Sequence, residues 1–121
     1  MLITAAFLTF FIGLVHSVLG EKYLISRLLR RDNLPKLLGG DWFTKRLIRF
    51  AWHLTTIAWW GMAAIMLIMH NPEASLMKSL AVVLALVFGL SGLLALIFSK
   101  GKHLSWIVFF AIAGLTFAST M

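Results

Sequence analysis

Four long stretches of the sequence are apolar and almost free of charge, and they restrict the fold more than any other feature. Residues 50–69 form 20 consecutive positions without Asp, Glu, Lys or Arg. A helix of that length rises about 30 Å, the thickness of the hydrocarbon core of a bilayer. Hydrophobic residues make up 61% of the chain, against roughly 45–50% in soluble domains. We therefore predict that lipid surrounds most of the chain.

The expected fold class is an all-α integral membrane protein with four transmembrane helices in a bundle. We expect a single membrane domain over residues 1–121, with spans near residues 2–19, 50–69, 76–98 and 104–121. No basic residue precedes the first run and no small-x-small cleavage site closes it, so an uncleaved helix is expected in place of a signal peptide. Pro72 predicts a turn at residues 70–73, because it disfavours a helical conformation for the preceding residue.

The basic residues are distributed unevenly between the predicted loops. The long connection over residues 20–49 carries eight of the 11 Lys and Arg residues, and Lys100 and Lys102 lie in the third loop, whereas Lys78 alone lies near the second. Cytoplasmic loops are rich in Lys and Arg. We therefore expect the first and third loops in the cytoplasm, both termini outside, and the bacterial inner membrane as the location. The net charge of +7 indicates attraction to anionic lipid headgroups, and nucleic-acid binding is not expected.

The basic connection contains the pattern of a short amphipathic helix. Leucine and isoleucine recur at helical spacing over residues 24–29, with arginines on the opposite face, which is typical of a helix lying in the headgroup region. Gly39 and Gly40 are expected to break the chain, and Asp41 is a candidate N-cap for the second span. The candidate headgroup-binding residues are Arg27, Arg30, Arg31, Lys45, Arg46 and Arg49.

Small residues recur on the predicted helices and indicate contact faces, because close approach matters more than hydrophobic burial between helices in lipid. The first span carries them at every fourth position, from Ala5 to Ser17. The third span carries Ala81, Ala85 and Gly89, followed by Gly92, and the fourth carries Gly114 and Ala118.

The predicted topology places three of the four histidines on the cytoplasmic side. His16, His53 and His103, with Glu21, could together form a metal site, because imidazole and carboxylate are ligands of zinc, copper and iron. Two facing histidines could instead hold haem. The flat side chains that could line such a cofactor are Trp52, Trp59, Trp60 and Trp106.

A structural interpretation of the same residues competes with the cofactor site. A histidine near a helix end can hydrogen-bond a neighbouring hydroxyl, and Ser17 and Thr56 are close in sequence to His16 and His53. By this interpretation Glu21 pairs with Lys22 or Arg27, and tryptophans at mid-depth pack between helices.

Three functions follow from these features. We expect a non-enzymatic accessory, assembly or interaction module that forms a homo-oligomer or joins a larger membrane complex, because we find no Ser-His-Asp set, phosphate loop or intramembrane carboxylate pair. The alternative is a redox, sensor or enzyme module with haem or a divalent transition metal bound at the cytoplasmic side of the bundle. A proton-relay role is a separate interpretation of the same histidines. A further alternative is an oligomeric small transporter, although the first span lacks a carboxylate.

Overall fold

A computed structural model of the chain describes residues 1–71 and 75–121, and this part is helical with short connections. Pro72 and Glu73, which belong to the predicted turn, lie outside the described residues. The elements in chain order are α1 (Leu2–Leu19), the π-helical segment η1 (Gly20–Ile25), α2 (Ser26–Leu28), α3 (Trp42–His70), α4 (Leu76–Ser99) and α5 (Ser105–Ala118).

Three of the predicted spans are present as helices long and apolar enough to cross a membrane. These are Leu2–Leu28, in which α1 continues through η1 and α2, and the helices α3 and α4. The helix α3 begins at Trp42, so the basic turn before residue 50 is helical as well. The fourth predicted span is represented by α5, which is apolar but only 14 residues long.

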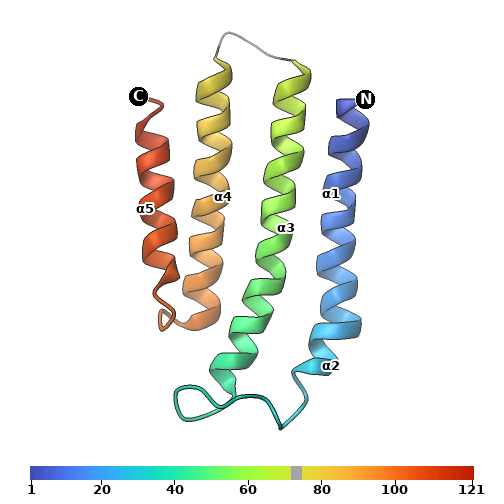
Figure 1. Ribbon diagram of the computed structural model, residues 1–121, viewed down its shortest axis with the longest axis vertical. Helices are drawn as coiled ribbons and strands as arrows, with labels where there is room; N and C mark the ends of the chain where they lie inside the picture. Colours follow the sequence, from blue (N-terminus) through green and yellow to red (C-terminus); the bar gives the residue numbers. More distant parts are fainter. Residues whose placement is uncertain (72–74) are drawn as a thin grey trace.

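The long helices form an open single layer in which each contacts its neighbour in the chain (Figure 1). The order across the layer is α1, α3, α4 and α5, and both termini lie at the end away from the long connection. Within the described residues, α1 approaches neither α4 nor α5, and α3 does not approach α5. The prediction of a bundle therefore holds only for neighbouring pairs, because the layer does not close on itself.

The amphipathic segment of the long connection is helical, but it does not form a separate helix. The π-helical turn η1 joins it to α1, and Gly20 keeps right-handed helical angles at the junction. Ile25 and Leu29 of this segment are buried, whereas Leu24 is exposed. The prediction of a separate interfacial helix fails because residues 2–28 contain no residue that stops a helix, such as proline.

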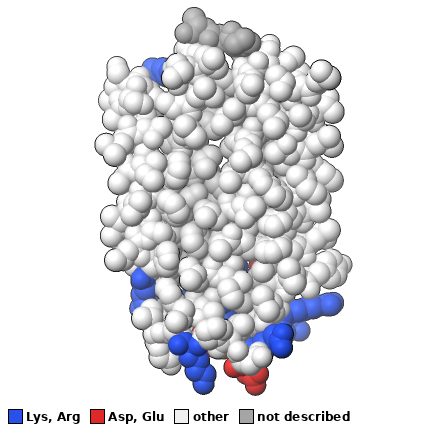
Figure 2. All heavy atoms as spheres, viewed as in Figure 1, with Lys and Arg blue, Asp and Glu red and all other residues white. Residues whose placement is uncertain are grey.

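The largest buried side chains gather at the end of the layer where the basic residues lie. Figure 2 shows that Lys and Arg collect mainly at this end and that the middle of the molecule is uncharged. Phe43 and Phe50 of α3 are buried here together with Ile25 and Leu29. The hydroxyl of Thr44 donates to the carbonyl of Pro35 at 2.7 Å and ties the connection to α3. The helices are therefore held together most firmly at their basic end.

Elsewhere the helices approach one another through small residues, as predicted for α1 and α4. Gly13 and Gly92 are buried, and a Cβ on Gly92 would lie 3.0 Å from the ring of Phe110. The prediction for α5 is wrong, because Gly114 and Ala118 are exposed. The neighbouring Ala113 approaches Gly89 of α4 instead.

The contact between α3 and α4 should be sensitive to one methyl group at Gly61. A Cβ at this buried position would collide with Cγ2 of Val87, and a valine in a helix has one strongly preferred rotamer. We expect Gly61→Ala to destabilise the protein by about 1–3 kcal/mol, or several degrees in Tm, in detergent unfolding measured by circular dichroism. Gly114→Ala, where the new Cβ meets nothing within 4 Å, should leave Tm unchanged or slightly higher. Equal Tm changes in the two variants would contradict this packing.

Candidate functional site

The candidate site lies between α1 and α3, where polar side chains on the two helices face each other. Ser17 and Glu21 are one helical turn apart, and Arg49, His53 and Thr56 follow one stripe of α3. Hydrogen bonds join the two sets across the contact. We call these five residues the polar seam.

Glu21 is the centre of the polar seam. Arg49 holds the carboxylate from two sides, with Nη2 2.9 Å from Oε1 and Nε donating to Oε2 at 3.3 Å. His53 Nε2 lies 3.2 Å from Oε2, and Ser26 donates its hydroxyl to Oε1 at 3.3 Å. The side chains of Glu21 and Arg49 are 31% and 37% exposed. The expected pairing of Glu21 with Lys22 or Arg27 is wrong, since these cations lie over the ring of Tyr23.

A chain of hydrogen bonds continues from His53 into the helix contact. His53 Nδ1 lies 2.8 Å from Ser17 Oγ, Ser17 Oγ lies 2.8 Å from Thr56 Oγ1, and Thr56 donates to the carbonyl of Gly13 at 3.3 Å. An ionised carboxylate only accepts hydrogen bonds, so Nε2 carries the proton directed at Glu21. In neutral His53, Ser17 donates to Nδ1 and Thr56 donates to Ser17 in place of Gly13. In charged His53, the Nδ1–H donates to Ser17, Ser17 donates to Thr56, and Thr56 donates to Gly13.

His16 and Trp52 form a second, separate contact between the same helices. Their rings stack with centroids 4.2 Å apart and planes 10° from parallel. His16 Nε2 donates to the carbonyl of Trp52 at 3.3 Å, and Trp52 Nε1 donates to the carbonyl of His16 at 3.1 Å. Trp59 is also close to the imidazole, with centroids 5.0 Å apart and ring planes tilted by 57°. Gly20 makes room for this arrangement, because a Cβ there would overlap the indole of Trp52.

His103 lies apart from the polar seam, among the buried rings of the basic end. It is near Phe43 and Phe50, with centroids 6.4 Å away in each case, and Nδ1 shares a hydrogen bond with the hydroxyl of Ser105. Trp106 Nε1 donates to the carbonyl of Gly101 at 3.2 Å. The structure thus brings Glu21 and His53 together, while His16 and His103 have other partners.

The described residues include no group of three or more His, Cys, Asp or Glu side chains that could hold a metal ion. Both nitrogens of His53 and the Nε2 of His16 have hydrogen-bond partners within the protein. A metal or haem bound by His16 and His53 would therefore have to displace the contacts that join α1 to α3.

Three of the predicted headgroup-binding residues have partners within the protein. Arg49 belongs to the polar seam, and Arg46 donates to the carbonyl of Phe98 at 3.3 Å. Lys45 lies 2.6 Å from Asp41, at the start of α3. The hydrogen bond from Lys45 holds the pKa of the Asp41 carboxyl below its usual value. Asp41 occupies the predicted N-cap position, but its side chain makes no capping hydrogen bond. Arg27, Arg30 and Arg31 are exposed at the basic end.

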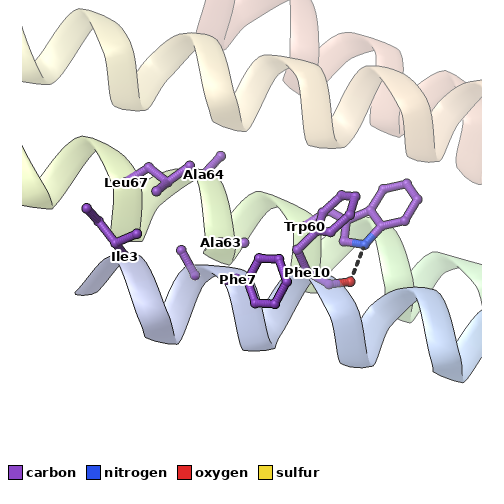
Figure 3. A pocket seen from close by; sticks show the side chains of 8 residues that line it. Ile3, Phe7, Phe10, Trp60, Ala63, Ala64 and Leu67 are labelled. Carbon is purple, nitrogen blue, oxygen red and sulfur yellow. Dashed lines mark hydrogen bonds between the residues drawn. The ribbon is translucent and has the colours of Figure 1, made fainter. Parts of the chain in front are cut away.

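A cavity of about 450 Å³ lies between α1 and α3 at the end away from the basic residues. Its lining includes Ile3, Phe7, Phe10 and Leu67 and is apolar except for the indole N–H of Trp60 (Figure 3). That N–H donates to the carbonyl of Phe10 at 3.1 Å, so no free polar group faces the cavity. Trp60 thus packs between helices, as the structural interpretation expects.

Ser17, His53 and Glu21 stand in the order of a Ser-His-acid triad, which the sequence analysis did not find. The hydrogen-bonding order alone does not make a hydrolase site, because acyl transfer also needs donors that stabilise an oxyanion. Ser17 lies within α1, where the nearby backbone N–H groups bond to the preceding turn and so cannot stabilise an oxyanion. The polar seam is therefore suited to joining two helices and to moving a proton along them.

The spacing of the residues could have revealed part of the polar seam. Ser17 and Glu21 are four residues apart, as are Arg49 and His53, which places each pair on one helix face. Consecutive helical residues point about 100° apart, so His16 and Ser17 cannot both face His53. Sequence analysis did not determine which of them does.

Comparisons of the chain with protein-family models, curated proteins and solved structures found no match.

The pairing of Glu21 with Arg49 should appear in a double-mutant cycle. We expect Glu21→Gln and Arg49→Gln each to lower Tm, because each leaves the partner charge uncompensated near the membrane. The double variant should be more stable than the two losses predict, with a coupling of about 1 kcal/mol, since both side chains are partly exposed. Thermal unfolding in one detergent measures all four proteins.

The pair of Asp41 and Lys45 provides the control for this cycle. It is a partly exposed pair within one helix end, so Asp41→Asn should leave Tm almost unchanged. Additive losses for Glu21→Gln and Arg49→Gln would show that the two charges do not act as a pair.

Proposed function

We propose that the protein is a non-enzymatic membrane module, an accessory, assembly or interaction protein that acts through its helix faces. The observation that carries this proposal is the open layer, in which the described helices touch only their neighbours in the chain. A layer has two broad faces and two edges. Lipid covers part of this surface, and we expect another copy of the chain or a different membrane protein to cover the rest.

The outer helix α5 supports an interaction at one edge of the layer. Its 14 described residues include none that is buried, and Leu115 is 76% exposed. A Cβ added to Gly114 would meet nothing within 4 Å. Small residues allow helices to approach closely in lipid, so this side of α5 could receive a partner helix.

We further propose a four-span topology with the basic end in the cytoplasm of a bacterium and both termini outside. The apolar helix α5 lies beside α4 and would be the fourth span. At 14 residues it rises about 21 Å, less than the hydrocarbon core, so the bilayer would have to thin locally or α5 would have to be covered by a partner. The concentration of Lys and Arg at one end (Figure 2) supports the orientation.

The polar seam has a structural role in this proposal, and His53 remains a candidate proton relay. Its hydrogen bonds can run in either direction without moving a heavy atom, as the two protonation states of His53 require. To relay protons across the membrane, the chain of hydrogen bonds would have to continue along α3 past Thr56, toward the end away from the basic residues. On the stripe of α3 that follows Thr56, the next residue is Trp60, whose N–H is already bonded.

Reporter fusions test the topology. Fusions of alkaline phosphatase and green fluorescent protein at Gly39 and at Gly101 should both report a cytoplasmic location, because both glycines lie in basic connections. Fusions at the C-terminus should report the opposite side. Opposite locations for Gly39 and Gly101 would exclude the four-span arrangement.

The mass of the purified protein tests the interaction module. In a mild detergent we expect an oligomer of the 13.6 kDa chain or a stoichiometric partner, measured by light scattering after size exclusion and by mass spectrometry. An absorption spectrum and elemental analysis of the same sample test the alternative. Colour or metal that disappears in His16→Ala and His53→Ala would favour a haem or metal site, and a colourless monomer without a partner would contradict the interaction module.

A further inference from the structure

A groove with one polar end runs along α3 on the side of α4. Two cavities, of about 320 and 180 Å³, share Ile57, Trp60 and Leu90 in their linings, so they adjoin. The larger cavity extends toward Ile97 and the smaller one toward Ala64. The groove exists because α1 and α4 stand on either side of α3 without approaching each other in the described part of the chain.

The polar side chains of the groove all lie at its basic end. They are Ser17, His53 and Thr56 of the polar seam, while the rest of the lining is aliphatic apart from Trp60. The indole N–H of Trp60 is donated to Phe10 and is not available. An occupant that matches this lining has one small polar group at the end of an apolar body. Volumes of this size are typical of small-molecule sites.

The polar end of the groove lies just inside the hydrocarbon core in the topology proposed above. His53 is three residues beyond Phe50, where the apolar span begins, or about 5 Å along the helix axis, and Ala64 lies about 16 Å further. The two nearest arginines of α3, Arg46 and Arg49, bond to the carbonyl of Phe98 and to Glu21, and neither lines the groove. A small uncharged polar group therefore fits this end better than a phosphate.

The hydrogen bonds of the polar seam determine which polar group fits. When His53 is neutral, Ser17 donates to it and accepts from Thr56; when His53 is charged, Ser17 accepts from it and donates to Thr56. In both states every polar hydrogen of His53, Ser17 and Thr56 is already donated, while Ser17 Oγ and Thr56 Oγ1 keep free lone pairs. Ser17 is the more accessible of the two hydroxyls, since Thr56 is only 3% exposed. The site can accept a hydrogen bond but has none to give.

We propose that this groove binds a membrane-soluble alcohol, with its hydroxyl donating to Ser17 Oγ and its chain lying along Ile57, Trp60 and Leu90. The inference rests on the membrane embedding proposed above and not on the oligomeric state. The alcohol can be isoprenoid or straight-chain, since both present the same hydroxyl at the end of an apolar chain. A bound alcohol would extend the polar seam by one hydrogen bond without displacing any of its members.

Photolabelling of the full-length protein in nanodiscs tests the proposal. The probe is a straight-chain alcohol with a diazirine in its tail, and the competitors are dodecanol, farnesol and the methyl ether of each. We expect label on residues 57–60 and 90–97. Each alcohol should compete roughly three- to tenfold better than its ether, because one hydrogen bond in an apolar site is worth about that factor. The ratio between dodecanol and farnesol distinguishes the two chain types.

Two variants locate the site. Ser17→Ala should abolish the preference for alcohol over ether while the ethers still compete, which shows that the groove persists. Leu90→Phe should reduce labelling by filling the groove. Leu84→Phe, on the same helix but outside the lining, should not.

Three results would overturn the proposal. They are equal competition by alcohols and ethers, label spread evenly over all lipid-facing helices, and crosslinks between copies through Leu90 in place of probe labelling. The reporter fusions measure the topology separately, so a failed topology and an empty groove give different results.

Discussion

Two apolar helices in lipid gain little from burying their side chains against each other, because the lipid is as apolar as leucine. The contact between α1 and α3 therefore depends on close approach and hydrogen bonds. Trp52 and Trp60 donate their indole N–H groups to the carbonyls of His16 and Phe10 on α1. Such a carbonyl already accepts the helical hydrogen bond, and its second lone pair is free for the indole.

This contact also explains two glycines of α1. A Cβ on Gly13 would lie 2.9 Å from Nε1 of Trp60, and one on Gly20 would overlap Trp52. The absence of both side chains lets the large indoles approach the α1 backbone closely. With the separation of the two helices set in this way, Ser17 and Glu21 come within hydrogen-bonding distance of His53. The polar seam thus depends on the tryptophans that flank it.

The lengths of the apolar runs were enough to predict three long apolar helices, although α3 begins eight residues before the predicted span. They were not enough to predict how the helices pack, since a helix surrounded by lipid is apolar on every side and hydrophobicity does not mark its contact face. Gly114 is an example: the sequence alone does not distinguish a small residue that faces α4 from one that faces lipid. The prediction that the four helices form a bundle holds only in part, for a related reason. Short loops determine which helices are neighbours, but they do not determine whether the first helix meets the last.

The rotation of α1 about its axis also decided the candidate site. Sequence analysis grouped His16 with His53 because they lie at similar depth, but similar depth does not make two side chains face each other. The structure turns Ser17 toward His53 and His16 toward Trp52. The group that pairs with Glu21 inside the contact is Arg49, which the charge pattern had assigned to lipid headgroups. A cation near a membrane boundary can serve either role, and only the position of its carboxylate partner distinguishes them.

The open layer makes the polar seam accessible in a way that a closed bundle would not. In a closed bundle α4 would cover Ser17 and Thr56, and their hydrogen bonds would serve only to hold the helices together. Here α4 stands beside α3 and leaves Ser17 lining a groove. One hydroxyl therefore joins α1 to α3 and also faces the space where a ligand can lie. A protein partner that covered this face of the layer would compete with such a ligand, whereas one that bound the free side of α5 would not, so assembly and ligand binding are compatible only if they use different surfaces.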